Sequence, residues 1–382
     1  MSTRGAEAPA SSGSKGGVAL ITGATGLVGR YLVMHLAQLG GWKVYAVSRK
    51  DKLQYEEMPE GLGDHVAAVK VDDLLNANAV SSALQGLPGV THIFHCAYLT
   101  SGSDQYKDAV DNLALLKHVV EAVEARGSAK LRHVYVQAGA KWYGQHLGKY
   151  KTPAKESDCR YMPPNFYYDM VDYVQARVAG GADWTWSALL PNPVIGYSPG
   201  SYMNLLNAVA AYAAICKEMH LPFRFPGSDA AYDALTECCD VRLLAEAIVF
   251  TSTNPAAANA IFNVSNGDVF RWNEVWPLIG KHLGLEVAPP QAVSLATAMT
   301  TPDKQQAWRA LLKQHNIKHA AAAAYDKLVP WGFTDFCFGM GFDYFQSVTK
   351  LRRAGFEGMK LDTGEMWMGW LDELKQQRIL PL

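Results

Sequence analysis

The sequence has little that would tie it to a metal ion, a membrane or a charged polymer. Its six cysteines contain no CxxC pair and its 11 histidines form no HExxH motif, so we expect free thiols and no metal site. No apolar run is long enough to cross a bilayer, and a net charge of -1 gives no attraction for nucleic acid or anionic lipid. These absences favour a cytoplasmic enzyme or binding protein that acts on a small molecule.

The segment at residues 1–16 is rich in Ala, Ser and Gly and lacks the apolar core of a secretion signal. It is predicted to be a disordered N-terminal tail.

A short apolar run, Val18–Thr22, leads into three glycines spaced three residues apart. Gly23 permits a tight turn, Gly26 allows the backbone to approach a pyrophosphate, and Gly29 lets the next helix pack close to the strand. Apolar residues then recur at helical spacing as far as Leu39. The pattern predicts a dinucleotide site, with the phosphates at the helix N-terminus.

Short β-rich runs and helical patterns alternate after this motif, which predicts a Rossmann fold: a doubly wound parallel sheet in an α/β protein. We expect the NADP-binding domain to span 17–196, with part of 230–265 returning to it. A smaller, mostly helical region over 197–382 would cap the substrate. The expected strands are Lys43–Val47, Val66–Val71, Thr91–Cys96, Leu131–Val136, Trp186–Leu190 and Ala260–Val264, and the expected helices include Ala77–Leu87, Ala109–Ala125, Tyr168–Val178 and Tyr202–Met219.

The end of the second strand distinguishes between the two nicotinamide cofactors. Ser48, Arg49 and Lys50 stand where an NAD-selective site carries an acid. A guanidinium can bind a 2'-phosphate through two hydrogen bonds, so NADPH/NADP is the predicted cofactor. The two basic residues could instead belong to a solvated loop. Asp73, at the end of the third strand, could bind the adenine amino group or cap the following helix.

No tyrosine in the chain is followed by lysine four residues later, although this pair carries the chemistry of most short-chain dehydrogenases. Two other segments stand in its place: Gln137–Gly144, which contains Lys141, and Asn165–Asp169, which reads NFYYD. With the TGxTGxxG loop and the basic turn after the second strand, these segments resemble the atypical extended reductases of the progesterone 5β-reductase and iridoid synthase-like family. Further similar segments follow in order at Pro191–Pro193, Gly196–Pro199, Ser201–Asn204, Ala211–Lys217 and Phe262–Phe270.

The resemblance implies an NADPH-dependent 1,4-reduction of an α,β-unsaturated carbonyl compound, by a homodimer. Tyr168 and Lys141 would be the catalytic pair that stabilises the enolate oxygen while hydride reaches the β-carbon. Tyr98, Trp142, Tyr143, Tyr202, Met203 and Phe342 would line the substrate pocket. The cofactor-binding residues would be Thr22, Gly23, Thr25, Gly26, Leu27, Val28, Gly29, Ser48, Arg49, Lys50, Asp73, Leu74, Cys96, Ala97, Gln137, Ala138, Gly139, Tyr168, Pro191, Asn192, Val194, Ser201 and Met203.

Two other functions remain open at this point. A nucleotide-sugar epimerase or dehydratase shares the glycine motif, but it needs the missing Tyr/Lys pair. A non-catalytic NADP-binding sensor needs neither tyrosine nor lysine. Fold alone does not decide between these functions.

Overall fold

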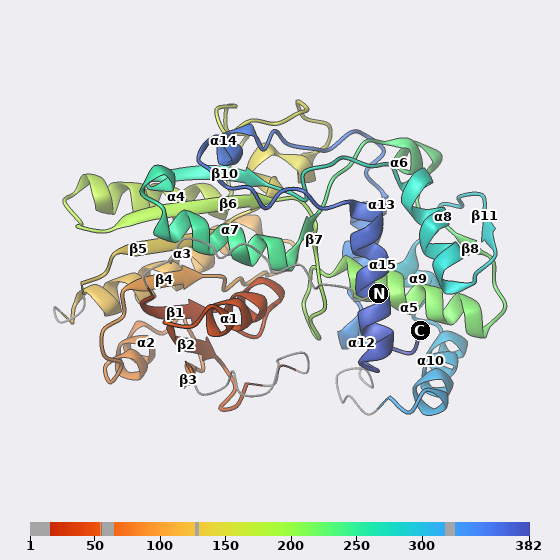
Figure 1. Cartoon of the computed structure of the whole chain (residues 1–382), viewed down its shortest axis with the longest axis horizontal. Helices are drawn as coiled ribbons and strands as arrows, with labels where there is room; N and C mark the ends of the chain where they lie inside the picture. The colour runs from red at the N-terminus through yellow and green to blue at the C-terminus, as the bar shows by residue number, and fades with distance from the viewer. Residues whose placement is uncertain (1–15, 54, 56–64, 127–129, 318–324) are drawn as a thin grey trace, which may run out of the picture.

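A computed structural model describes residues 16–53, 55, 65–126, 130–317 and 325–382. Residues 1–15 of the predicted N-terminal tail lie outside this part. Seven parallel strands form the central sheet in the order β10-β6-β5-β4-β1-β2-β3, as Figure 1 shows. The strands are β1 (Val18–Thr22), β2 (Lys43–Ser48), β3 (Val66–Lys70), β4 (His92–His95), β5 (His133–Gln137), β6 (Thr185–Pro191) and β10 (Ala260–Val264).

Helices cover both faces of this sheet because alternate residues of each strand are apolar on opposite sides. In β1, Ala19 and Ile21 belong to one buried cluster and Leu20 to the other. The first cluster includes α1 (Leu27–Leu39) and α7 (Val241–Thr253), which pack together. The second includes α3 (Gln105–Glu124), which packs between α2 (Ala77–Leu84) and α4 (Phe166–Ala179). The predicted doubly wound fold is therefore confirmed.

Two of these helices begin earlier than their apolar patterns suggested. The α4 helix starts at Phe166 because the Asn165 side chain accepts a hydrogen bond from the Tyr167 amide. The α3 helix starts at Gln105 after Asp104, which accepts from the Lys107 amide. In both cases a side-chain cap, rather than an apolar residue, marks the first turn.

The cap region lies beside the sheet and is mostly helical (Figure 1). Its longer helices are α5 (Leu205–Glu218), α8 (Trp272–Leu283), α10 (Pro302–Gln314), α13 (Trp331–Phe338) and α15 (Thr363–Gln376). Shorter elements of the cap are α6 (Asp229–Asp233), α9 (Leu295–Ala298), α12 (Tyr325–Leu328), β8 (Phe223–Arg224) and β11 (Val287–Ala288). Elsewhere, α14 (Thr349–Arg353) packs on β10, and β7 (Val194–Ile195) pairs with β9 (Cys239–Asp240). The described residues also form the 3-10 helices η2 (Ala140–Tyr143), η3 (Gln145–Leu147) and η4 (Pro255–Ala257).

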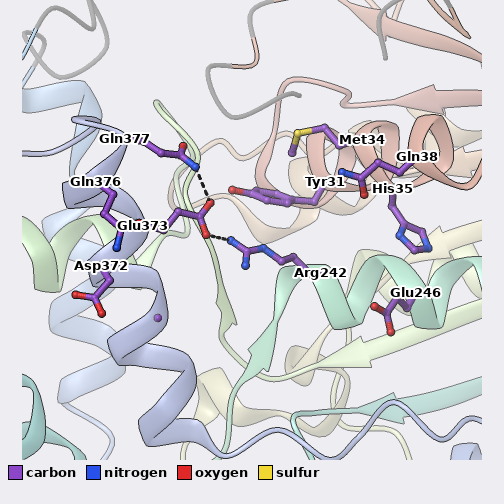
Figure 2. Close-up of a pocket in the computed structure, with 11 residues that line it drawn as sticks. Tyr31, Met34, His35, Gln38, Arg242, Glu246, Asp372, Glu373, Gln376 and Gln377 are labelled. Atoms are coloured by element: carbon purple, nitrogen blue, oxygen red, sulfur yellow. Dashed lines mark hydrogen bonds and ion pairs between the residues drawn. The ribbon is translucent and has the colours of Figure 1, made fainter. Parts of the chain in front are cut away.

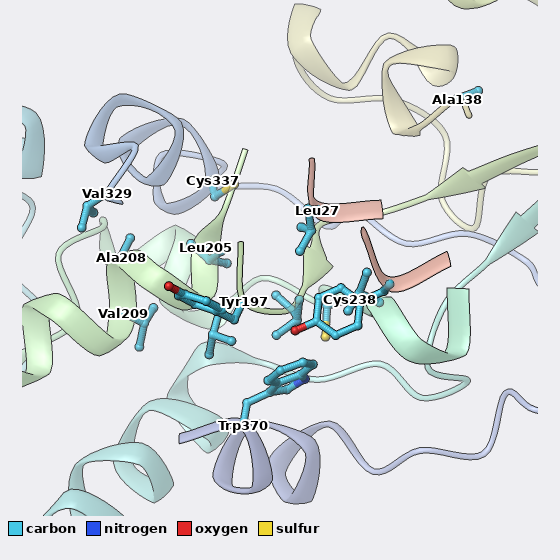
Figure 3. Packing of buried hydrophobic residues seen from close by; sticks show 14 of the residues in the cluster. Leu27, Ala138, Tyr197, Leu205, Ala208, Val209, Cys238, Val329, Cys337 and Trp370 are labelled. Carbon is cyan, nitrogen blue, oxygen red and sulfur yellow. The ribbon is translucent and has the colours of Figure 1, made fainter. Parts of the chain in front are cut away.

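Aromatic rings hold the cap together. Trp276 stacks on Phe223 with ring centres 4.3 Å apart, and Phe225 contacts Phe338 at 4.8 Å. Each such ring removes a large apolar area from water. The same buried cluster continues to Leu27 of α1 and Trp370 of α15 (Figure 3), so the cap and the first helix of the sheet domain share one core.

None of the helices in the described part of the chain is long and apolar enough to span a bilayer.

Candidate active site

A cavity of about 1050 Å³ opens at the carboxyl ends of the parallel strands. In an open α/β sheet a ligand binds at this edge, where the strand order reverses, and here that point lies between β1 and β4. One part of the cavity wall comes from the loops after β1, β2, β3, β4, β5 and β6, and another from α4 and α13. The cavity therefore joins a nucleotide-binding edge to the cap.

The glycine loop brings its backbone close to the loop after β4. Gly23 has a φ of 65°, and a Cβ at this position would lie 2.6 Å from the carbonyl oxygen of Cys96. Gly26 is the N-cap of α1 and has no side chain to cover the first turn. The N-terminus of α1 is thus a cradle of backbone N–H groups that fits a pyrophosphate.

The basic turn after β2 also lines the cavity. The Ser48 hydroxyl accepts a hydrogen bond from the amide of Lys50 at 3.1 Å and donates to the Lys50 carbonyl at 2.9 Å. This closes a tight turn in which Arg49 and Lys50 are exposed. Asp73 lies nearby and accepts from the Leu75 amide, whereas Asn76 is the side-chain cap of α2. The side-chain cap of α2 is therefore Asn76 and not Asp73.

Lys141 lies in the cavity wall, in η2 directly after β5. Its backbone carbonyl accepts a hydrogen bond from Asn165, which fixes η2 against the start of α4. Burial lowers the pKa of the Lys141 ammonium, and the negative charge of Asp108 acts in the opposite direction. In the described part of the chain Lys141 forms no ion pair, so its charge is available to an anion in the cavity.

The predicted role of Tyr168 needs correction. Its hydroxyl donates to the carbonyl of Trp142 at 2.5 Å and accepts from the amide of Tyr161 at 3.0 Å. Tyr168 is buried and does not belong to the cavity wall. Both hydrogen-bonding directions of the phenol are used inside the protein, so it has no direction left for a ligand.

The tyrosine that lines the cavity is Tyr167, one residue earlier. Its ring packs on Phe166 with centres 4.2 Å apart, and its hydroxyl lies close to Gly139, where an added Cβ would come within 3.2 Å of it. Burial raises the pKa of the Tyr167 hydroxyl, and Tyr98 adds to the rise. The phenol therefore stays protonated at neutral pH and can donate a hydrogen bond.

Most other predicted residues are brought together at this cavity. The cofactor set lines it except for three residues, and Tyr98, Tyr202 and Met203 of the predicted substrate set line it too. The predicted residues that lie elsewhere are Thr22, Gly29, Trp142, Tyr143, Tyr168 and Phe342.

Each of these exceptions has a structural role in the protein interior. Thr22 contacts Nδ1 of His95 at 3.1 Å, and the Tyr143 hydroxyl donates to Oδ1 of Asn263 at 2.7 Å. Gly29 packs against the glycine loop, Trp142 meets the Tyr168 ring edge-on, and Phe342 packs against the main core. A motif position alone does not show which way its side chain points.

Comparison with known proteins identifies the family of the chain. A model described as a PRISE-like Rossmann-fold domain matches residues 66–381. The chain belongs to this family. It is 31% identical to an (S)-8-oxocitronellyl enol synthase of Nepeta racemosa over 376 residues, which cover 95% of this chain and 93% of that protein. It is 29% identical to the 3-oxo-Delta(4,5)-steroid 5-beta-reductase of Arabidopsis thaliana, with coverage of 95% and 93%.

Solved structures show the same fold at lower sequence identity. The Bordetella bronchiseptica enzyme WbmG, in complex with NAD, aligns with a TM-score of 0.64 and 16% identity, over 96% of each chain. The predicted PRISE-type fold and membership of an oxidoreductase family are thus confirmed by the family match.

The sequence-based prediction missed the cap side of the PRISE cavity. Phe166 and Met170 of α4 line the cavity together with Tyr167. Gln145 of η3, which comes earlier in the chain, also lines it. Four residues on or just after α13 complete the wall: Phe333, Phe336, Cys337 and Met340. No local signal decides between the two tyrosines of α4, because each has an apolar residue three positions later: Met170 after Tyr167 and Val171 after Tyr168.

A second cavity, of about 610 Å³, lies between α1, α7 and α15. Figure 2 shows Arg242 and Glu373 directed at one another in an ion pair, and Glu373 also accepts a hydrogen bond from Gln377. Asp372 pairs with His282. This cavity lies apart from the carboxyl ends of the strands, so it is not a candidate for the family's chemistry.

Proposed function

We propose that this protein is an NADPH-dependent enone reductase, which reduces the C=C bond of an α,β-unsaturated carbonyl compound by 1,4-addition. The observation that carries the proposal is the pairing of an unneutralised ammonium, Lys141, with a protonated phenol, Tyr167, in the wall of one cavity. An epimerase would need a tyrosine followed by a lysine four residues later, which the chain lacks. Similarity in fold to epimerases does not decide the reaction.

Three features of the chain support a bound dinucleotide. The Gly23 turn leaves space that a Cβ would fill, the N-terminus of α1 has no side-chain cap, and Arg49 with Lys50 forms a cationic rim. A 2'-phosphate would bind at that rim, which favours NADPH over NADH. When bound, the reduced nicotinamide supplies a hydride to the β-carbon of the substrate.

The protein's own groups then act on the substrate oxygen. The Tyr167 hydroxyl donates a hydrogen bond to the carbonyl oxygen, and the Lys141 ammonium stabilises the negative charge that develops there as the enolate forms. Because Tyr167 keeps its proton, the enolate carbon takes its proton from solvent. The apolar wall from α4 and α13 keeps water away from the charged oxygen and strengthens both interactions.

The test is reduction of an enone panel by the purified protein with NADPH, with product identification and with saturated ketones as controls. We expect loss of the C=C bond and retention of the carbonyl group. Consumption of NADPH only with saturated ketones would show a carbonyl reductase instead, and no consumption at all would favour the non-catalytic sensor.

A matched pair of lysine variants tests the site. Lys141→Met should lower kcat about 100-fold, the usual effect of losing one group that stabilises an oxyanion. Lys149→Met, at an exposed position nearby, should leave kcat unchanged. Equal kcat values for the two variants would remove Lys141 from the mechanism. The cytoplasmic location and the homodimer stay predictions of the sequence.

A further inference from the structure

Gln145 is a buried amide in the cavity wall that the proposed reaction does not use. It follows Gly144, which has a φ of 72° and leaves space for the ring of Tyr161. Gln145 is 7% exposed as a residue and lines the same cavity as Lys141. Burial of an amide costs free energy unless both its N–H and its C=O find partners.

The protein satisfies this amide poorly. Nε2 of Gln145 donates to the thioether sulfur of Met340 at 3.4 Å, and sulfur is a weak acceptor. Within the ranges that the structure describes, Oε1 of Gln145 receives no hydrogen bond. The amide therefore has one weak contact where it could form several strong ones.

Gln137 shows what a satisfied cavity glutamine looks like. Its Oε1 accepts from the Tyr135 hydroxyl at 2.7 Å, and its Nε2 donates to the Ala138 carbonyl at 2.7 Å. Both residues line the same cavity. Of these two glutamines, Gln145 is the one that keeps hydrogen-bonding capacity for a ligand.

The cap side of the cavity, where Gln145 contacts Met340, is lined mainly by apolar residues. Phe333, Phe336 and Cys337 belong to the same cap wall. A wholly hydrocarbon substrate tail would fill this part of the cavity but leave the amide unpaired, whereas an oxygen atom on that tail would pair it. A site built in this way discriminates more strongly by hydrogen bonding than by size.

We infer that Gln145 is a specificity-determining residue that binds a second oxygen function of the substrate, a hydroxyl or carbonyl group remote from the enone. The inference rests on the proposed function for the location of the enone itself. The expected substrates are apolar α,β-unsaturated carbonyl compounds that carry a second oxygen.

The experiment compares two substrates that differ in one group: a medium-chain 2-alkenal, and the same alkenal with a hydroxyl group at its far end. The wild-type protein should prefer the hydroxylated compound by about 5- to 10-fold in kcat/KM, the effect of one neutral hydrogen bond. Gln145→Met, which keeps the length of the side chain but not its amide, should bring the ratio close to 1. An equal ratio in both proteins, or no preference in the wild type, would overturn the inference.

Two further variants test whether another group causes the preference. Met340→Leu removes the sulfur acceptor and leaves the amide free, so the preference should stay or increase. Tyr202→Phe removes a hydroxyl at the cavity rim that is already in water, since Tyr202 is 59% exposed, so the preference should stay. Loss of the preference in Tyr202→Phe alone would assign it to that hydroxyl and not to Gln145.

Binding of unreactive ligands separates this inference from the proposed reaction. The dissociation constants of the two saturated aldehydes, with and without the far hydroxyl, are measured for the protein–NADP⁺ complex by calorimetry. A preference in the wild type that Gln145→Met abolishes supports the role of Gln145 even if no enone is reduced. No preference in the wild type contradicts it, whatever the result of the enone panel.

Discussion

The hydroxyl of Tyr168 donates a hydrogen bond to the backbone carbonyl of Trp142, at 2.5 Å. Trp142 directly follows Lys141 in η2, and Tyr168 belongs to the first turn of α4. Arg160 lies over the Tyr168 ring, 4.8 Å from its centre, and over the ring of Trp142 at 5.1 Å. The second tyrosine of the NFYY segment therefore holds the lysine-bearing turn in place, while the first faces the cavity.

This division of roles predicts different effects for the two tyrosines. Tyr167→Phe should lower kcat by 100-fold or more, because one donor to the developing oxyanion is lost. Its free energy of unfolding should change little, since within the described residues the Tyr167 hydroxyl forms no hydrogen bond that the variant would lose. Turnover with an enone and urea unfolding are measured on the same preparations.

Tyr168→Phe is the matched control. It should lower the free energy of unfolding by about 1–3 kcal/mol, because the Trp142 carbonyl and the Tyr161 amide lose a buried partner. Its kcat should fall far less than that of Tyr167→Phe. A larger loss of kcat in Tyr168→Phe, at normal stability, would restore the tyrosine expected from the sequence.

The basic turn after β2 predicts a cofactor preference. Arg49→Met should weaken NADPH binding about 10- to 100-fold, since a charge-assisted hydrogen bond to the 2'-phosphate is lost. NADH binding should not change. Lys52→Met, at an exposed position outside the cavity wall, is the control and should bind both cofactors like the wild type. Equal weakening of NADPH and NADH by Arg49→Met would exclude a 2'-phosphate contact.

Two glycines with nearly the same positive φ differ in the space around them, so they test the effect of a steric clash. Gly23 and Gly40 have φ angles of 65° and 67°, but only at Gly23 would a Cβ meet other atoms, 2.6 Å from the Cys96 carbonyl oxygen. Gly40→Ala should cost about 1–3 kcal/mol of stability, because its ψ of 168° places it in a region that is almost exclusive to glycine. Gly23→Ala should cost clearly more and abolish NADP⁺ binding, because the loops after β1 and β4 must separate. Similar losses of stability in urea unfolding, with NADP⁺ binding retained in both, would refute the predicted clash.

Local patterns in the sequence predict the nucleotide side of this site well. The strand with its three glycines and the basic turn after β2 are each a short contiguous segment, and their backbone geometry follows from residue type. Gly23 and Arg49 lie in the cavity wall for this reason. The resemblance to a family also located the segments of Lys141 and of the tyrosines.

The choice between Tyr167 and Tyr168 needed the helix start. The Asn165 cap fixes where α4 begins, and that start decides which of two adjacent tyrosines faces the core. Neighbouring helical residues point about 100° apart, so an error of one residue changes the face.

The cap side could not be predicted from local patterns. Gln145 and Met340 touch across 195 positions of the sequence, and no pattern around either residue indicates the other. Packing of α13 over the cavity depends on the whole aromatic core of the cap. The substrate-facing wall is therefore where sequence reasoning was weakest.

A buried acid next to the cavity predicts how stability depends on pH. Oε1 of Glu237 accepts from Nδ2 of Asn192 at 2.6 Å and from the Gln346 amide at 3.0 Å. Burial raises the pKa of Glu237 from 4.5 to about 8, although the hydrogen bonds from Asn192, Ser265 and Gln346 oppose the rise. At neutral pH the carboxyl group is therefore protonated in the folded protein.

The sign of the effect follows from proton binding. Between pH 4.5 and about 8 the folded protein holds a proton on Glu237 that the unfolded chain has released, so this group makes the protein less stable as pH rises through that window. Above it the contribution is constant. Glu237→Gln is neutral at every pH and keeps an acceptor for Asn192, so it removes this dependence.

The stability difference between Glu237→Gln and the wild type should therefore shift in favour of the variant between pH 5.5 and pH 8, by at most about 1.4 kcal/mol per pH unit. Urea unfolding of both proteins at several pH values measures it, and subtraction removes the groups that titrate alike in both. Parallel profiles would mean that Glu237 ionises in the folded protein near its ordinary pKa. The carboxylate would then have to be stabilised by its hydrogen bonds against burial and the nearby charge of Asp268.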